Sequence, residues 1–304
     1  MKKIIVLGGA GFIGSKTAIE LYKLNYNILI IDNLSTGRKE NLDKNIKFIK
    51  TDIGNIQKMD KIFKEFKPDV LYNFAFNVLV PKSIEDPSLE IKSIKDHISI
   101  LELCKKYKVK KNIFPSTGFV YGNINKNKSI KEDDQISLEN PYSIAKFTAE
   151  KFTIYYQKKF NLDYTILRYA AIYGPGQVTG AMSDYIRSAK KDIPCQFWGN
   201  KKTRDYVFIN DAVKANIKCL DNLASRKILN IGTGRGTNLF SLYVNICKIL
   251  KVEPKPIFNP EIIGEQDNYK LDSSFVKKSL NWSPKTSFRE GLKNTIEHHI
   301  KYNL

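Results

Sequence analysis

The chain has 304 residues, of which 42% are hydrophobic, so it is large enough for one large core or for two lobes of a globular protein. No apolar run reaches the roughly 18 residues of a membrane span, and the short run after Lys2 and Lys3 is not a secretory signal, so we expect a soluble cytoplasmic protein with no membrane partner. The formal net charge is +19, but the lysines are scattered, which favours a solvated surface over a nucleic-acid site. That charge would still help to gather an anionic substrate.

The cysteines and histidines do not follow the patterns of metal sites. The four cysteines lie far apart and form no C-x-x-C pair, as expected of buried, reduced thiols. The three histidines have no ligand spacing to cysteines or carboxylates, so we predict no metal site. The residues concerned are Cys104, Cys195, Cys219, Cys247, His97, His298 and His299.

Short apolar runs alternate with amphipathic stretches along the first half of the chain. The helical spacing is seen in Ser15–Leu24 and in Leu89–Tyr107. Strands and helices that alternate in this way favour an α/β fold with a doubly wound parallel sheet of the Rossmann type. The runs that we predict as its strands are Ile4–Leu7, Ile28–Ile31, Ile46–Ile49, Val70–Phe74, Ile113–Phe114 and Ile166–Tyr169.

The pattern loosens after residue 171, and we place a domain boundary there. Residues 1–171 are predicted to form the Rossmann domain, and residues 172–304 a smaller C-terminal α/β lobe that holds the substrate. Two further short strands, Val207–Ile209 and Ile228–Ile231, lie in a stretch, 205–232, that we expect to return to the main sheet. The substrate should lie between the lobes, at the carboxyl ends of the strands.

The first predicted strand is followed by a glycine-rich segment, Gly8–Gly14, after which a helical pattern begins. Glycines there let the backbone turn tightly and approach a pyrophosphate, whose charge faces the N–H groups at the start of the helix. This position between strand and helix predicts a dinucleotide site. The contacts that we expect from it are Gly8, Gly11, Phe12, Ile13 and Gly14.

The second predicted strand leads into an acid, Asp32. An acid at this point accepts hydrogen bonds from the adenosine ribose and repels a 2′-phosphate, which favours NAD over NADP, although Asp32 could instead only cap a loop. Asp52, near the end of the next run, is predicted to contact the adenine edge. Asn33 and Ile53, which follow these two acids, complete the predicted cofactor contacts.

A tyrosine and a lysine lie four residues apart at the start of a long amphipathic segment. Asn140 suits the cap of this helix and Pro141 its first turn, so Tyr142 and Lys146 would share one face. Such a spacing also occurs in surface pairs. An ammonium about 4 Å from the phenol, at an effective dielectric near 20, would lower the pKa of Tyr142 by roughly three units, to about 7. The phenol would then exchange a proton with a sugar hydroxyl.

Two hydroxyl residues, Ser116 and Thr117, follow the run Ile113–Phe114 at a strand end. Hydroxyls in loops are commonly only turn formers. In combination with Tyr142, one of the two is predicted to hydrogen-bond the same substrate oxygen.

Taken in order, these motifs resemble those of the NAD-dependent epimerase/dehydratase family of extended short-chain dehydrogenases/reductases, most closely its UDP-glucose 4-epimerase-like members. The resemblance covers nearly the whole chain, and it implies NAD as the cofactor and a nucleotide-diphosphate sugar as the substrate. Its motifs are Gly8–Gly14, Ile31–Gly37, Ser116–Gly122, Asn140–Lys146, Leu167–Gln177, Thr203–Ala215, Asn230–Thr237 and Ser279–Leu292.

The resemblance also implies roles for single residues. It makes Thr117, Tyr142 and Lys146 the catalytic group. It places Tyr169 near the nicotinamide and makes Arg204 the arginine that binds the substrate diphosphate, a task that suits its planar fork. The strand end that passes beneath the cofactor is Phe74, Ala75 and Phe76.

The chain departs from the family's pattern at several positions. The 4,6-dehydratases place an Asp–Glu pair directly after the catalytic Ser/Thr, whereas Gly118 and Phe119 stand here, which disfavours dehydration. Ala171 stands where an Asn is usual, and Ile262 lies near a common second arginine for the diphosphate. Ser93 occupies a position that is often Asn.

A second glycine-rich stretch, Gly232–Gly236, lacks the Lys-Ser/Thr ending of a nucleoside-triphosphate loop. We interpret it as a turn that lines the substrate cleft, with Arg235 near the nucleotide. The predicted substrate contacts are therefore Ser116, Thr117, Tyr142, Arg204 and Arg235.

We predict an NAD-dependent nucleotide-sugar 4-epimerase of the UDP-hexose type that works through a transient 4-keto intermediate. The alternatives are an NAD(H)-dependent reductase of a 4-keto nucleotide sugar, another nucleotide-sugar epimerase, and a binding protein that keeps the fold without the chemistry. Family members often pair through the helix that holds the catalytic tyrosine and the long helix before it. That helix carries more aromatic residues than one core face needs, so we expect a homodimer; they are Phe147, Phe152, Tyr155 and Tyr156.

Overall fold

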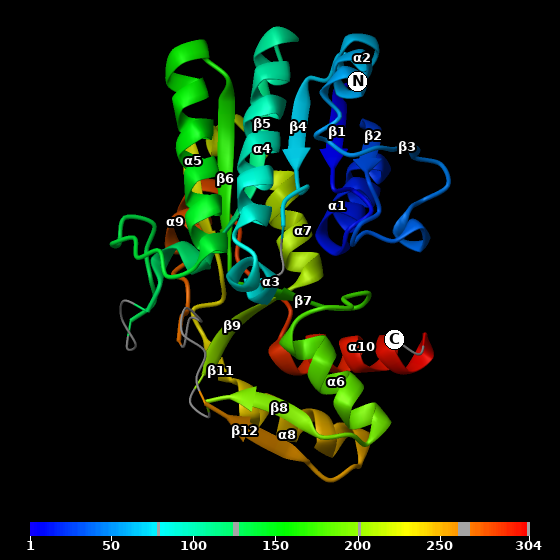
Figure 1. The fold of residues 1–304 in the computed structure, drawn as a ribbon, viewed down its shortest axis with the longest axis vertical. Helices are drawn as coiled ribbons and strands as arrows, with labels where there is room; N and C mark the ends of the chain where they lie inside the picture. The colour runs from blue at the N-terminus through cyan, green and yellow to red at the C-terminus, as the bar shows by residue number, and fades with distance from the viewer. Residues whose placement is uncertain (78–79, 124–127, 200–201, 261–267, 303–304) are drawn as a thin grey trace.

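A seven-stranded parallel sheet forms the centre of the computed structural model, which describes the chain apart from residues 78–79, 124–127, 200–201, 261–267 and 303–304 (Figure 1). The strand order is β10-β6-β5-β4-β1-β2-β3, and every neighbouring pair is parallel, which confirms the predicted Rossmann fold. The strands are β1 (Lys3–Leu7), β2 (Asn27–Asp32), β3 (Lys47–Lys50), β4 (Val70–Asn73), β5 (Lys111–Thr117), β6 (Asp163–Tyr169) and β10 (Lys227–Ile231).

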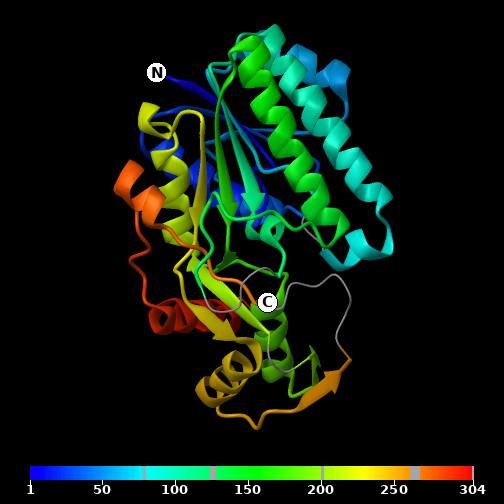
Figure 2. The same ribbon diagram turned by 90° about the vertical axis from the view of Figure 1, so that its left-hand side faces the viewer.

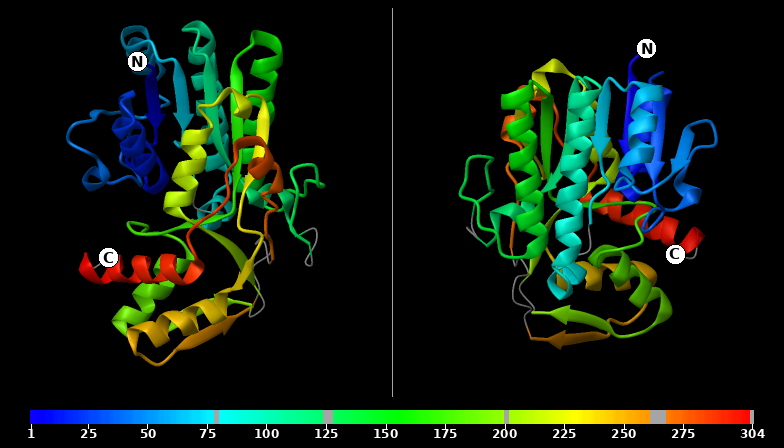
Figure 3. Two further views of the ribbon diagram at one scale, coloured as in Figure 1. Left: turned by 180° about the vertical axis from the view of Figure 1, so that it is seen from behind. Right: turned by 45° about the horizontal axis from the view of Figure 1, so that its top comes forward.

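Helices cover both faces of this sheet (Figures 2 and 3). Side chains alternate between the faces along β1, so that Ile4 and Val6 join one buried cluster and Ile5 and Leu7 the other. Because both faces are buried, these strands appear in the sequence as continuous apolar runs. One face is covered by α2 (Ile56–Phe66), α4 (Ser88–Lys106) and α5 (Pro141–Phe160), and the other by α1 (Phe12–Lys23), α7 (Ile209–Lys218) and α9 (Ser274–Leu280).

The order of the strands reverses between β1 and β4. The chain runs from β1 outward to β2 and β3, and then crosses back to β4, β5 and β6 on the other side of β1. Such a reversal opens a crevice at the carboxyl ends of the two central strands, where ligands of this fold class bind. The segments Gly8–Gly14, Phe74–Phe76 and Ser116–Thr117 all lie at strand ends on this edge.

The remaining elements form a smaller α/β lobe, drawn below the main sheet in Figure 1. Two of its helices, α6 (Ala181–Lys191) and α8 (Leu239–Leu250), pack against each other. An aromatic cluster joins Phe197 of β8 (Cys195–Trp198) to Tyr185, Tyr243 and Phe258. The strands are β7 (Ala171–Tyr173), β9 (Thr203–Phe208) and β11 (Gly236–Asn238) in one sheet, with β8 (Cys195–Trp198) paired to β12 (Pro256–Asn259). The helices of this lobe are α6, α8 and α10 (Phe288–Lys301). Outside the lobe, the chain also forms α3 (Val80–Glu85) and three short 3-10 turns at Lys39–Asn41, Gly118–Tyr121 and Asn222–Ala224.

Of the two later strands expected to return to the main sheet, only one does so. Lys227–Ile231 is β10, which pairs with β6 at the sheet's edge. The other is β9, which pairs with β7 and β11 in the smaller sheet, so its predicted return is wrong. The reason is that only Ala170 separates β6 from β7, which carries the chain out of the main sheet and offers β9 a new edge.

Among the described residues, no helix has the length and apolarity to cross a membrane, and no three His, Cys, Asp or Glu side chains are grouped as metal ligands. All four cysteines are buried and free of disulfides.

Candidate active site

The glycine-rich segment makes a turn that larger residues would obstruct. Gly8, at the end of β1, has a φ of +68°, and a Cβ there would lie 2.7 Å from the carbonyl carbon of Phe74. A Cβ on Gly14 would lie 2.3 Å from the backbone oxygen of Gly8. No side chain caps the N-terminus of α1, whose N-cap residue is Gly11. The segment therefore combines the close backbone approach and the helix N-terminus that a pyrophosphate needs, which fits a dinucleotide.

The predicted ribose carboxylate is held beside this turn. Asp32 is 7% exposed, and its two carboxylate oxygens accept hydrogen bonds from the backbone N–H groups of Ala10, at 2.9 Å, and Leu34, at 2.7 Å. Asp32 thus caps a loop, as the alternative interpretation held, and it also places a fixed negative charge at the end of β2. That charge fits the two hydroxyls of an NAD ribose and opposes a 2′-phosphate.

Asp52 and Asn33 lie together next to this carboxylate. The amide of Asn33 donates to Asp52 at 2.8 Å, and the backbone N–H of Gly54 donates to it at 2.7 Å. Partial burial raises the pKa of Asp52, but hydrogen bonds from Gly54, Asn33 and Lys92 outweigh burial and lower it overall. Ile53, also predicted as a cofactor contact, is 8% exposed.

The strand end Phe74–Phe76 connects the glycine turn to the catalytic residues. Its first residue touches the turn, since Phe74 lies within van der Waals reach of Gly8. At its other end, the ring of Phe76 lies 4.1 Å from Nζ of Lys146. The strand end therefore joins the glycine turn to the predicted catalytic group.

Helix α5 positions Tyr142 and Lys146 through its N-terminal cap. The side chain of Asn140 accepts from the backbone N–H of Ser143 at 2.8 Å, and Ser143 returns the contact in a capping box, with Pro141 in the first turn. This confirms the predicted start of the helix. Tyr142 and Lys146 are both buried, and the hydroxyl of Tyr142 is hydrogen-bonded to the side chain of Thr117.

The two hydroxyl residues at the end of β5 have different hydrogen-bond partners, because successive side chains of a strand point to opposite faces of the sheet. Thr117 lies with Tyr142, and its Oγ1 also accepts from the backbone N–H of Phe119 at 3.2 Å. Ser116 donates to Glu150 instead and is 3% exposed, so it belongs to a buried polar network. Only Thr117 is brought to the phenol.

Burial dominates the protonation of the catalytic pair. It raises the pKa of Tyr142, with a smaller lowering effect from the Thr117 hydrogen bond. It lowers the pKa of Lys146 to about 7, against the raising effects of Glu90 and Glu150. The ammonium of Lys146 donates to the carbonyl of Pro115 at 2.8 Å and lies 6.0 Å from the centre of the Tyr142 ring.

The predicted lowering of the pKa of Tyr142 to about 7 by Lys146 is therefore wrong for the side chains of this chain alone. Burial penalises the phenolate and the ammonium alike, so each group is driven toward its neutral form. A positive charge from the cofactor is needed to favour the phenolate.

Aromatic rings connect the catalytic tyrosine to the predicted diphosphate arginine. The ring of Phe119 lies 6.3 Å from that of Tyr142 and 5.6 Å from that of Tyr269, measured between centroids. The guanidinium of Arg204, on β9, lies 5.8 Å from both Phe119 and Tyr269. Phe119 thus lies between Tyr142 and Arg204, which belongs to the smaller lobe.

The second glycine-rich stretch wraps a buried carboxylate. The backbone N–H groups of Thr233 and Gly234 donate to Asp205 of β9 at 2.9 Å and 3.0 Å. Asp205 is fully buried and occupies the donors that a phosphate loop would offer to a ligand. The stretch is therefore a turn between the lobes, and Arg235, just after it, is exposed.

Several other predicted positions have defined neighbours. Tyr169 is buried, and its hydroxyl donates to Asn216 of α7. Ser93 of α4 donates to the backbone oxygen of Leu89 at 3.1 Å. Ala171 begins β7 and is partly buried. Ile262 lies outside the described residues.

Sequence reasoning missed four groups close to the site. Glu90 and His97 of α4 lie near Lys146, and the ion pair of Glu150 and Arg168 lies beneath it. Tyr269, which is 3% exposed, lies against Phe119. No short motif marks these residues, because they come to the site from α4, α5, β6 and the segment that holds Tyr269.

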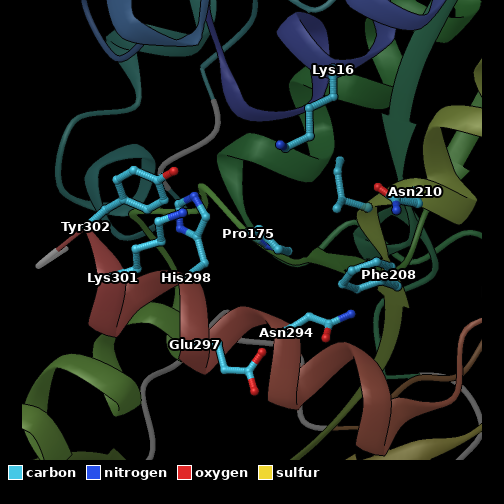
Figure 4. A pocket seen from close by; sticks show the side chains of 10 residues that line it. Lys16, Pro175, Phe208, Asn210, Asn294, Glu297, His298, Lys301 and Tyr302 are labelled. Carbon is cyan, nitrogen blue, oxygen red and sulfur yellow. The ribbon is translucent and has the colours of Figure 1, made fainter.

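A separate pocket of about 420 Å³ lies between α1 and α10 (Figure 4). Lys16 reaches into it from α1, and His298, Lys301 and Tyr302 line it from the C-terminal end of the chain. Partial burial lowers the pKa of Lys16. None of the predicted catalytic residues lines this pocket.

Comparisons with known proteins agree with this geometry. Residues 4–232 match the model of the NAD dependent epimerase/dehydratase family. A putative UDP-glucose 4-epimerase of Methanocaldococcus jannaschii is 33% identical over 303 residues, with 96% of this chain and 97% of that protein covered. The structure of a UDP-glucose 4-epimerase of Thermotoga maritima with UDP-glucose has a TM-score of 0.95 at 33% identity and covers 99% of this chain and 100% of that one. A UDP-glucuronic acid 4-epimerase of Bacillus cereus, in complex with UDP-glucuronic acid and NAD, has a TM-score of 0.92 at 28% identity, with 99% of each chain covered.

Proposed function

The chain belongs to the NAD dependent epimerase/dehydratase family, and we propose that it is an NAD-dependent epimerase that inverts the C4 hydroxyl of a UDP-hexose. One observation carries the proposal: the hydroxyls of Thr117 and Tyr142 are hydrogen-bonded at the end of β5, next to the cradle formed by the glycine turn and Phe74–Phe76. A sugar 4-hydroxyl placed between these groups and the cofactor can lose its proton to Tyr142 while the carbon that bears it loses a hydride.

The residues of the chain move the proton. Oxidised NAD, when bound, supplies a hydride acceptor and a positive charge that favours the phenolate of Tyr142. The phenolate oxygen accepts the proton of the sugar 4-hydroxyl. Thr117 holds the sugar oxygen O4 in place by a hydrogen bond. Lys146 supplies positive charge from the next turn of α5. Once the 4-keto sugar has turned in the cleft, the hydride returns to the opposite face of its C4. Tyr142 gives the proton back to O4, and the configuration at C4 is inverted.

The positions that follow Thr117 do not support dehydration. A Cβ on Gly118 would lie 3.1 Å from the ring of Tyr269 and 3.2 Å from Leu271, so the site has no room for a carboxylate there. Phe119 fills the space between Tyr142 and Tyr269. Neither residue transfers a proton, whereas removal of water across C5 and C6 needs an acid and a base.

The smaller lobe is proposed to hold the nucleotide. Arg204 offers its planar fork to the diphosphate, and the rings of Phe119 and Tyr269 keep its guanidinium at the cleft. Arg235 lies in the exposed turn beyond Asp205 and is proposed as a further contact to the nucleotide.

The test is to incubate the purified protein with UDP-glucose, UDP-galactose, their N-acetylated forms and UDP-glucuronic acid, and to follow product stereochemistry by NMR. Interconversion of a 4-epimer pair without added NADH is the expected result, and the substrate that reacts fastest names the sugar. Tyr142→Phe should abolish turnover while NAD stays bound. Activity only on a 4-keto sugar, with one NADH consumed per product, would identify a reductase instead.

We also propose that the protein is a homodimer that pairs through α4 and α5. These helices lie side by side on one face of the molecule (Figure 1). They also carry exposed apolar side chains. Ile91 of α4 is 70% exposed, and Ile144 and Tyr155 of α5 are 47% and 52% exposed. Tyr156 is buried and Phe147 and Phe152 are partly buried, so of the four aromatics only Tyr155 is available to a partner.

A further inference from the structure

A buried glutamate, Glu90, lies beside the catalytic pair and has no part in the mechanism above. It stands in the first turn of α4 and is 3% exposed. One of its oxygens, Oε1, accepts from the side-chain amide of Asn77 at 2.6 Å. The other, Oε2, is buried with no hydrogen-bond partner among the described residues. Asn77 directly follows Phe74–Phe76, so Glu90 is tied to the strand end beside the cofactor cradle.

The other titratable groups around Lys146 are already balanced or neutral. On α5, Glu150 is paired with Arg168 of β6 at 2.7 Å. On α4, burial lowers the pKa of His97 to about 3, so its ring is neutral at physiological pH. The groups that reach Lys146 from β5 and from the segment after β4 are a carbonyl and two phenyl rings. Glu90 is the remaining buried acid, and within the described part of the chain it has no ion pair of its own.

We infer that Glu90 is a positioning residue that supplies the counter-charge of Lys146 and so sets the pH range over which Tyr142 exchanges its proton. This inference rests on the proposed catalytic function of Tyr142 and Lys146. Glu90 acts through these two side chains.

The charge of Glu90 acts on both groups with the same sign. It raises the pKa of Lys146, which burial lowers, and it adds to the effect of burial in raising the pKa of Tyr142. Catalysis needs the ammonium of Lys146 and the phenolate of Tyr142. Removal of the charge lowers both pKa values, so the acidic and the alkaline limbs of the activity profile move together toward lower pH.

The first test compares the pH dependence of kcat/KM for the NAD-loaded enzyme on UDP-galactose. Glu90→Gln keeps the size of the side chain and its acceptor for Asn77, and it removes only the charge. Both limbs are expected to move to lower pH by about one unit. Glu90→Asp keeps the charge, so both limbs should lie close to their wild-type positions. Glu85→Gln, which removes an exposed acid of the neighbouring helix α3, should leave the profile unchanged.

A raised KM at every pH with unmoved limbs would overturn the inference, because it would make Glu90 a contact to the substrate. An unmoved profile with unchanged KM would overturn it as well. A shift in only one limb would also contradict the shared effect on Lys146 and Tyr142.

The second test needs no turnover and therefore separates this inference from the proposed function. The side-chain amine of Lys146 is titrated by NMR in 15N-lysine-labelled, NAD-bound protein, with Lys146→Arg to assign its signal. The midpoint should fall by about one unit in Glu90→Gln. An unchanged midpoint overturns the counter-charge whether or not the protein epimerises a sugar. A lowered midpoint in a protein that turns over no UDP-sugar would uphold it while the proposed function fails.

Discussion

Removal of one partner from the buried ion pair beneath the active site should be among the most destabilising single changes in the protein. Glu150 and Arg168 are 1% and 4% exposed in their side chains. Two hydrogen bonds join them, from Arg168 Nη2 at 2.7 Å and from Arg168 Nε at 3.1 Å. Arg168 Nη1 also donates to the hydroxyl of Tyr121 at 2.8 Å. In Glu150→Gln the guanidinium stays buried and charged without a carboxylate.

The magnitude follows from the burial of both charges. A buried ion pair that loses one member costs about 3–5 kcal/mol, because the remaining charge has neither water nor partner. That is a large part of the roughly 5–15 kcal/mol that stabilises a protein. The double variant Glu150→Leu with Arg168→Met leaves no charge behind. It should lose no more than about 2 kcal/mol, which reflects the lost partner of the Ser116 hydroxyl, whereas the Tyr121 hydroxyl still donates to Asn230.

The assay is urea unfolding followed by circular dichroism, with the free energy of unfolding compared at equal m-values because a two-lobed chain can depart from two-state behaviour. Glu65→Gln, an exposed acid on α2, is the control for loss of a negative charge. A loss below about 1 kcal/mol in Glu150→Gln would refute the reasoning from burial. A double variant as unstable as the single one would refute the assignment of the cost to the uncompensated charge.

Three further changes test other parts of the structure. Gly14→Ala puts a Cβ 2.3 Å from the backbone oxygen of Gly8, so NAD binding measured by fluorescence should weaken at least tenfold, whereas Gly236→Ala in the smaller lobe should leave it intact. Lys146→Met should abolish turnover yet raise the free energy of unfolding at pH 6. The pKa of Lys146 is about 7 in the folded protein and 10.5 in the unfolded chain. The free-energy cost of burying the ammonium is therefore complete below pH 7 and decreases as the pH rises toward 10.5. A stability advantage of the variant that does not shrink between pH 7 and 9 would contradict this. Ile91→Glu on α4 should convert the dimer to monomer in light scattering, whereas Leu223→Glu, at a site 61% exposed in Asn222–Ala224, should not; a monomeric wild type at micromolar concentration would end the dimer proposal.

The main sheet could be predicted because its physical cause is local. Strands buried on both faces favour apolar residues at successive positions, and such runs stand out in β1, β2 and β4, whereas the edge strand β3 is only partly buried. The pairing of β9 could not be predicted in this way. Its residues suit either sheet, and its partner is decided by the single-residue step at Ala170, which directs the chain from β6 into β7.

The catalytic group could be predicted for a similar reason, but its protonation could not. The spacing of Tyr142 and Lys146 and the cap at Asn140 are local features of α5. The pKa values depend instead on burial and on charges from α4, whose first turn lies about fifty residues earlier in the chain. A pair interaction calculated from the motif alone left out the desolvation of both partners, which is the larger effect.

Glu90 shows what a sharper view of helix α4 would have revealed. A period of 3.6 residues puts Glu90, His97, Leu101 and Cys104 on one stripe, and the structure buries all four. Its neighbours Leu89 and Ile91 are 37% and 70% exposed, the reverse of what their polarity suggests. An acid that continues an apolar stripe while its apolar neighbours face outward is costly to bury, since its charge leaves water without an ion pair. A buried charge of this kind is typical of functional sites, and the charge of Glu90 acts on both Lys146 and Tyr142.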